Sequence, residues 1–281
     1  MARPSTRSPV VALVLACHPV PTVAVTVMAT VLVVSAGNNS PTVLVGAAAV
    51  LTGQLSIGWS NDLIDVRRDA AAGRQDKPLA AGGVSARAVA AATALALALT
   101  VALSMALGWR AGAAQLCVVA GGWVYSYPLK STPLSAAPFF VAFGALPAVA
   151  TLALPDPAWP PAWVLVAAGL IGVSAHFGNV LPDFDDDAAT GVRGLPHRIG
   201  RFGSAVAASL CAVTASVIAV VGSRPPWAWG AVALLVAVGL AGGGLVVVRR
   251  QRSSEAAFYT SMAVAAIGVT LIAVTGSIAN G

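Results

Sequence analysis

The sequence predicts an all-α fold, a polytopic membrane bundle of nine transmembrane helices. Of its 281 residues, 58% are hydrophobic and only 9% are charged, whereas a soluble domain carries about 25% charged residues. The mean hydropathy is +0.85. Apolar stretches near the roughly 20 residues needed to cross a bilayer recur along the whole chain. These observations predict an integral membrane protein that contacts the lipid bilayer along most of its length.

The predicted spans are rich in Ala, Gly and Val, small residues that let helices approach closely in lipid. They are residues 17–36, 42–60, 87–108, 111–127, 134–154, 160–180, 202–222, 226–248 and 256–277. No polar linker divides them, so we expect one domain over 1–281. Similar acidic segments follow the second and sixth spans, which predicts two four-helix pseudo-repeats with a ninth helix added.

Basic residues set the expected orientation. With these spans, 14 of the 16 Lys and Arg residues fall on one side, and only Arg110 and Arg224 on the other. Positive charge marks the cytoplasmic side, so the N-terminus should be cytoplasmic and the C-terminus outside. A bacterial plasma membrane is the expected location. The same bias accounts for the net charge of +6 without a nucleic-acid partner.

Acidic residues are concentrated in two short segments that follow apolar spans. Eight of the ten lie there: Asp62, Asp65, Asp69 and Asp76 in the first, and Asp183, Asp185, Asp186 and Asp187 in the second. Uncompensated charge at the end of a membrane helix is expensive. Such a cost indicates that the two acidic segments have a function. The predicted topology places both segments at the cytoplasmic end of the bundle.

Each acidic segment has the four-residue spacing of one helical face. The two series are Asn61, Asp65, Asp69 and Asn179, Asp183, Asp187. We expect two helical stripes of oxygen ligands that face each other across a central cavity opening at the cytoplasmic end. Carboxylates without His or Cys suit Mg²⁺, which binds few carboxylates and leaves room for water and substrate phosphates.

Basic residues on the same predicted side complement the acids: Arg74, Lys77, Lys130 and Arg193. Their side chains suit phosphate oxygens that a metal leaves uncovered. Together with the apolar bundle, they indicate a substrate with a diphosphate group and a hydrocarbon tail.

Four segments of the chain resemble motifs of the UbiA superfamily of intramembrane prenyltransferases. They are Asn61-Asp62-x-x-Asp65-x-x-x-Asp69, the stretch Arg74-Gln75-Asp76-Lys77-Pro78-Leu79-Ala80-Ala81-Gly82, Tyr127-Pro128-Leu129-Lys130, and Asp183-x-x-x-Asp187-x-x-x-Gly191. Their order and spacing agree with the family. The resemblance therefore covers the second to the seventh predicted span.

The resemblance implies roles for individual residues. The implied Mg²⁺–diphosphate ligands are Asn61, Asp65, Asp183 and Asp187, and the implied catalytic residues are Asp62, Asp69, Tyr127 and Lys130. Lys130 is also implied to contact the diphosphate. Further diphosphate contacts carried over from the family are Arg74, Lys77 and Arg193.

The activity implied by the resemblance is transfer of an isoprenyl group from an allylic isoprenyl diphosphate to a hydrophobic acceptor, with release of diphosphate. A membrane terpene cyclase of the same superfamily would use the same metal site. A rival of a different class is an ion-coupled transporter or a lipid-binding membrane protein, although coupling carboxylates usually lie near the bilayer midplane.

The sequence departs from many relatives in the first span. Those that prenylate aromatic acids carry an Arg there that pairs with the acceptor carboxylate, whereas this chain reads Cys17-His18-Pro19-Val20-Pro21. The acceptor is therefore left open. His18 either hydrogen-bonds a phenol, acts as a base, or caps a helix or fills an interface.

Overall fold

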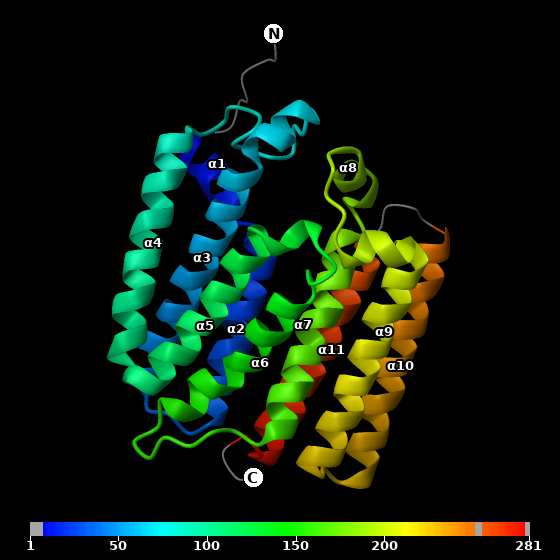
Figure 1. The fold of residues 1–281 in the computed structure, drawn as a ribbon. Coiled ribbons are helices and arrows are strands. Elements are labelled where there is room, and N and C mark those ends of the chain that lie inside the picture. Colours follow the sequence, from blue (N-terminus) through cyan, green and yellow to red (C-terminus); the bar gives the residue numbers. More distant parts are fainter. Residues whose placement is uncertain (1–7, 251–254, 279–281) are drawn as a thin grey trace.

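The computed structural model describes residues 8–250 and 255–278, which form α-helices, one short 3-10 helix (η1) and no β-strand (Figure 1). The elements are α1 (Pro9–Ala16), α2 (Pro19–Ser35), α3 (Ser40–Ala71), α4 (Ala86–Ala106), α5 (Trp109–Ser126), η1 (Leu129–Ser131), α6 (Ala137–Leu152), α7 (Ala162–Val180), α8 (Phe184–Ala189), α9 (Leu195–Ser223), α10 (Trp227–Arg250) and α11 (Ala256–Thr275). The predicted all-α class is confirmed.

Each apolar segment identified in the sequence coincides with a helix of this bundle. Among the described residues, six helices are long and apolar enough to cross a bilayer: α3, α4, α7, α9, α10 and α11. A seventh span results if α1 and α2, which meet at a 59° bend, count together. The count of nine spans stays a prediction, because α5 and α6 do not meet those criteria alone. α1 begins at one end of the bundle and α11 ends at the other (Figure 1).

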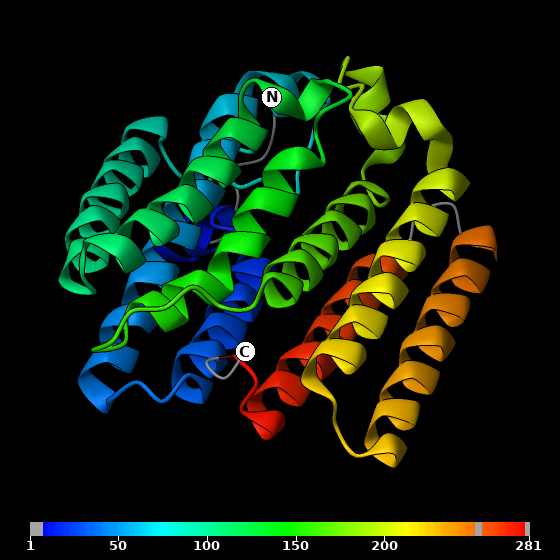
Figure 2. The same ribbon diagram turned by 60° about the horizontal axis from the view of Figure 1, so that its bottom comes forward.

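Six helices form a closed ring. Successive members contact each other in the order α2, α3, α5, α6, α7 and α11, and α11 returns to α2. α4 packs outside α3 and α5, while α9 and α10 lie on the opposite flank against α7 and α11 (Figure 2). Because the ring combines helices from the start, the middle and the end of the chain, residues far apart in sequence face the same interior.

The helix breaks at the start of the first predicted span. α1 ends before His18, which adopts left-handed backbone angles (φ 56°, ψ 69°), and α2 starts at Pro19. A proline disfavours the helical conformation of the residue before it and lacks an N–H for the helix ladder. The break turns the chain inward at His18.

The two acidic segments differ in structure. α3 continues to Ala71, so the predicted stripe of Asn61, Asp65 and Asp69 lies on one helix. The second predicted stripe is wrong as a continuous helix: α7 ends at Val180, Pro182 follows, and α8 starts only at Phe184. Proline explains the break, because its ring fixes φ and removes a hydrogen-bond donor.

Candidate functional site

A cavity of about 250 Å³ lies inside the helix ring and takes lining residues from all six of its helices. Its polar lining includes Asn61, Asp65, Arg68, Asp69, Arg74, Lys77, Lys130, Asn179, Asp183 and Asp187. Its apolar walls include Val25, Met28, Ile57, Phe139, Phe143, Leu146 and Ile171. The cavity therefore combines a charged region with a hydrocarbon-lined region.

Asp65 is the centre of a charge cluster. It is 5% exposed, and its Oδ2 accepts hydrogen bonds from Lys130 Nζ at 2.5 Å and forms an ion pair with Arg68 at 2.5 Å. Lys130 comes from η1 between α5 and α6, and Arg68 lies one helical turn after Asp65. A buried carboxylate needs such partners, since an unpaired buried charge is strongly destabilising.

Asp62 lies behind the cavity wall. It is 2% exposed, and its Oδ1 accepts from Lys77 Nζ at 3.1 Å and contacts His18 Nε2 at 3.0 Å. Lys77 and His18 both line the cavity. Asp62 therefore positions two lining side chains without lining the cavity itself.

Arg74 joins the two acidic segments. Its guanidinium donates two hydrogen bonds to Asp76, at 2.9 and 2.6 Å, and a third to Asp183 Oδ1 at 3.1 Å. The hydrogen bonds between Arg74 and Asp76 lower the pKa of the Asp76 carboxyl and raise the pKa of the Arg74 guanidinium. Segments separated by more than 100 residues are thus held at one end of the cavity.

The short helix α8 carries the rest of the second acidic segment. Arg201 holds it, by an ion pair to Asp185 at 2.9 Å, a hydrogen bond to the Leu181 carbonyl at 2.7 Å and a cation–π contact with Phe184. Asp187 lines the cavity. The pKa of Asp187 is raised above its usual value because the carboxyl is buried, and the nearby charge of Lys130 offsets part of this rise.

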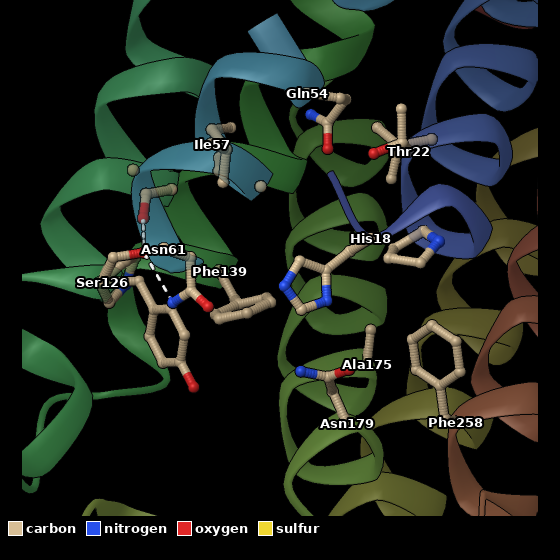
Figure 3. Close-up of a pocket in the computed structure, with 18 of the residues that line it drawn as sticks. His18, Thr22, Gln54, Ile57, Asn61, Ser126, Phe139, Ala175, Asn179 and Phe258 are labelled. Atoms are coloured by element: carbon tan, nitrogen blue, oxygen red, sulfur yellow. Dashed lines mark hydrogen bonds between the residues drawn. The ribbon is translucent and has the colours of Figure 1, made fainter. Parts of the chain in front are cut away.

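Amide side chains face each other where the charged region meets the apolar region. Figure 3 shows Asn61 of α3 and Asn179 of α7 projecting into the space between their helices. The amide nitrogen of Asn61 donates to Ser126 Oγ at 3.3 Å, which leaves its carbonyl oxygen available. An oxygen ligand is thus presented beside Asp65.

The model of the UbiA prenyltransferase family matches residues 22–268. The chain belongs to this family. The resemblance inferred from the four motifs is confirmed. No curated protein sequence gives a significant match to this UbiA family member.

Solved structures share the fold at low sequence identity. The apo structure of a UbiA homolog from Aeropyrum pernix is 20% identical with a TM-score of 0.73, over 90% of this chain and 97% of that one. A UbiA homolog from Archaeoglobus fulgidus bound to GPP and Mg²⁺ is 15% identical with a TM-score of 0.67, over 93% and 99%. A structure of digeranylgeranylglyceryl phosphate synthase is 14% identical with a TM-score of 0.68, over 97% and 99%.

The structure brings most of the predicted site residues together in this UbiA family chain. Those that line the cavity are Asn61, Asp65, Asp69, Arg74, Lys77, Lys130, Asp183 and Asp187. Asp62 lies directly behind them. Two predicted residues are not brought there: the side chain of Tyr127 is 73% exposed, and Arg193 is also exposed. Neither belongs to the cavity lining.

Sequence reasoning missed Tyr125, which lines the cavity from α5 and contacts the ring of Phe139 edge-on. A signal was available. Val118, Gly122 and Tyr125 recur at the helical spacing of one face, whereas Tyr127 follows the last residue of α5. The motif drew attention to Tyr127 in place of Tyr125 because it was considered without the helical period.

The donor set of the cavity fits Mg²⁺ in type. It consists of carboxylate and amide oxygens from two segments, and Mg²⁺ takes one or two carboxylates, keeping other positions for water and phosphate. Within the described ranges, no three His, Cys, Asp or Glu residues are gathered as a metal cage. Asp65 and Asp183 are instead paired with cations.

Proposed function

We propose that this UbiA family protein catalyses Mg²⁺-dependent transfer of an isoprenyl group from an allylic isoprenyl diphosphate to a hydrophobic acceptor, with release of diphosphate. The observation that carries the proposal is the division of one cavity into an acidic and basic region and an apolar region. The Archaeoglobus fulgidus homologs bound to GPP or DMAPP with Mg²⁺ support it.

The metal and diphosphate would bind in the charged region. Oxygens of Asn61, Asp65, Asp183 and Asp187 would hold Mg²⁺, with Asp69 and Asn179 beside them. When bound, Mg²⁺ neutralises diphosphate oxygens and so stabilises the negative charge that develops on the leaving group.

Lys130, Arg74 and Lys77 would bind the diphosphate oxygens that the metal leaves uncovered. Each is paired with a carboxylate in the structure, so substrate binding requires the cations to exchange Asp oxygens for phosphate oxygens. Charge-assisted hydrogen bonds that strengthen as the allylic C–O bond breaks lower the barrier to that step.

The apolar region would hold the isoprenyl chain and protect the carbocation-like centre from water. Tyr125, Phe139 and Phe143 line it, and aromatic faces attract a cation. The acceptor's nucleophile would then attack the allylic carbon in place of water.

In the membrane, we propose nine spans within one domain, with a cytoplasmic N-terminus and cavity opening and an external C-terminus. An odd number of spans agrees with α1 beginning at one end of the bundle and α11 ending at the other. The distribution of Lys and Arg supports the orientation.

Product analysis tests the proposal. Purified protein is incubated with Mg²⁺ and geranyl, farnesyl or geranylgeranyl diphosphate, with and without a panel of hydrophobic acceptors, and products are identified by mass spectrometry. We expect a prenylated acceptor plus diphosphate. A cyclic hydrocarbon or terpene alcohol as the main product without acceptor would make the protein a cyclase, and no consumption of any donor would contradict both enzyme activities.

A further inference from the structure

His18 lies at the break between α1 and α2 and projects its imidazole into the cavity, in the open space bordered by Asn61, Asn179 and Phe258 (Figure 3). Its φ of 56° is uncommon for a residue with a Cβ atom. Although His18 occupies the N-cap position of α2, its side chain makes no capping hydrogen bond. Helix capping therefore does not explain why a histidine with this backbone conformation occupies the position.

The backbone around His18 is fixed by its neighbours. Gly58 of α3 packs so closely on Cys17 that a Cβ atom there would lie 2.3 Å from the Cys17 carbonyl oxygen. The same oxygen accepts a hydrogen bond from Thr22 Oγ1 at 2.8 Å, and the Leu13 carbonyl accepts one from Trp59 Nε1 at 2.9 Å. An uncommon conformation held by such packing is a candidate for function.

Nε2 of the imidazole faces both a hydrogen-bond acceptor and a hydrogen-bond donor. Nε2 lies 3.0 Å from Asp62 Oδ1 and 3.2 Å from Lys77 Nζ, while Lys77 Nζ lies 3.1 Å from the same Asp62 oxygen. With its proton on Nε2, His18 donates to Asp62, and Lys77 donates to Asp62 as well. Nδ1 then carries a lone pair, and it has no hydrogen-bond partner among residues 8–250 and 255–278.

The Lys and Arg side chains around the cavity are already paired. Arg68 and Lys130 pair with Asp65, Lys77 with Asp62, and Arg74 with Asp76 and Asp183. The polar side chains labelled around His18 in Figure 3, Asn61, Asn179, Gln54 and Thr22, are neutral. Lys77, the cation in contact with His18, is paired with Asp62 and is assigned to the diphosphate. A carboxylate entering beside His18 would therefore compete with both for this cation, and desolvating it would be costly.

We propose that Nδ1 of His18 accepts a hydrogen bond from a neutral hydroxyl of the prenyl acceptor, an apolar alcohol or phenol without a carboxylate. Asp62 fixes the tautomer and orientation of the ring, as a carboxylate does for histidines that interact with substrates elsewhere. This inference rests on the proposed transferase activity, since it names the class of acceptor.

Three matched probes test the proposal: naphthol, naphthol with its hydroxyl methylated, and naphthol with an added carboxylate. Their dissociation constants are measured by calorimetry on the full-length protein in detergent, so no turnover is needed. We expect naphthol to bind about tenfold tighter than either derivative, as one hydrogen bond allows. Equal or tighter binding of the carboxylate or the ether would overturn the proposal.

Two variants assign the effect to His18. His18→Gly keeps the left-handed backbone accessible and removes the ring, so the preference for naphthol over its methyl ether should disappear. His18→Gln keeps an acceptor atom and a donor for Asp62, so part of the preference should remain. A preference that survives His18→Gly unchanged, with thermal unfolding like that of the wild type, would overturn the assignment.

Donor chemistry separates this inference from the proposed function. If wild type and His18→Gly both release diphosphate from geranyl diphosphate, and only the naphthol preference fails to change, the acceptor inference alone is wrong. If neither protein consumes any allylic donor, the transferase proposal is wrong, and the calorimetry still decides whether His18 binds a hydroxyl.

Discussion

Lys130 Nζ lies 2.5 Å from Asp65 Oδ2, so the cation proposed to bind diphosphate is paired with a carboxylate proposed to bind metal. Arg68 reaches the same oxygen at 2.5 Å. In the absence of substrate, the charged groups of the cavity neutralise each other. Since a buried charge without a partner is destabilising, these pairs also stabilise the folded protein.

Lys130→Ala should weaken donor binding far more than acceptor binding. Losing one charge-assisted contact to the diphosphate predicts a rise of about tenfold or more in the KM for the donor, while the KM for the acceptor stays nearly constant. Steady-state kinetics with each substrate varied in turn measures both. Lys130→Arg is the control that keeps the charge, and an unchanged donor KM in Lys130→Ala would remove the residue from the diphosphate site.

Arg74 and Arg193 were both expected to bind diphosphate, and the structure separates them. Arg74 lines the cavity and joins Asp76 to Asp183, whereas Arg193 is exposed outside the lining. Arg74→Ala should lower kcat/KM by about tenfold or more, because the two acidic segments lose the cation that joins them and the diphosphate loses a charge-assisted contact. Arg193→Ala should change it by less than about twofold, as exposed charges do. The reverse order of effects would refute this placement of the two arginines.

Gly58→Ala should destabilise the protein. The added Cβ would lie 2.3 Å from the Cys17 carbonyl oxygen, and overpacking of this kind costs about 1–3 kcal/mol. Gly242→Ala in α10 is the matched control, because no atom lies within 4 Å of the added group and Ala is favoured in a helix by about 0.8–1.0 kcal/mol. Thermal unfolding measured in detergent should show a lowered Tm for Gly58→Ala and not for Gly242→Ala.

Ala265→Phe should shift the donor preference toward a shorter isoprenyl chain. A second apolar cavity of about 70 Å³ shares Met28, Phe143, Leu146, Ile171 and Ala265 with the main one, so the two adjoin. A phenyl ring at this junction would close off the second cavity. In a competition between geranyl and geranylgeranyl diphosphate, the variant should favour the shorter donor more than wild type does. An unchanged product ratio would show that the chain does not use the second cavity.

Much of the fold could be predicted from sequence because bilayer length and hydropathy leave few alternatives for long apolar segments. All nine predicted segments coincide with helices. The four-residue spacing of Asn61, Asp65 and Asp69 also located the first half of the site, since α3 continues past the apolar segment to Ala71.

The parts that could not be predicted depend on local breaks and tertiary packing. Pro182 interrupts the second stripe, and Pro19 turns His18 into the cavity. Both prolines are visible in the sequence, but the direction of the chain after each break is set by packing between helices. The Arg74–Asp183 contact likewise follows from the closure of the ring, which no sequence spacing encodes.

Binding of a non-reactive isoprenyl diphosphate analogue in the presence and absence of Mg²⁺ tests the central claim most directly, because it requires both acidic segments at one site. Calorimetry compares wild type with Asp65→Asn, Asp183→Asn and Asp156→Asn, the last an exposed acid in the segment between α6 and α7. We expect Mg²⁺-dependent binding by wild type and Asp156→Asn, weakened about 100-fold in each of the other two variants, as for loss of a charged ligand. Unchanged Mg²⁺-dependent binding in Asp65→Asn or Asp183→Asn would contradict a shared Mg²⁺–diphosphate site.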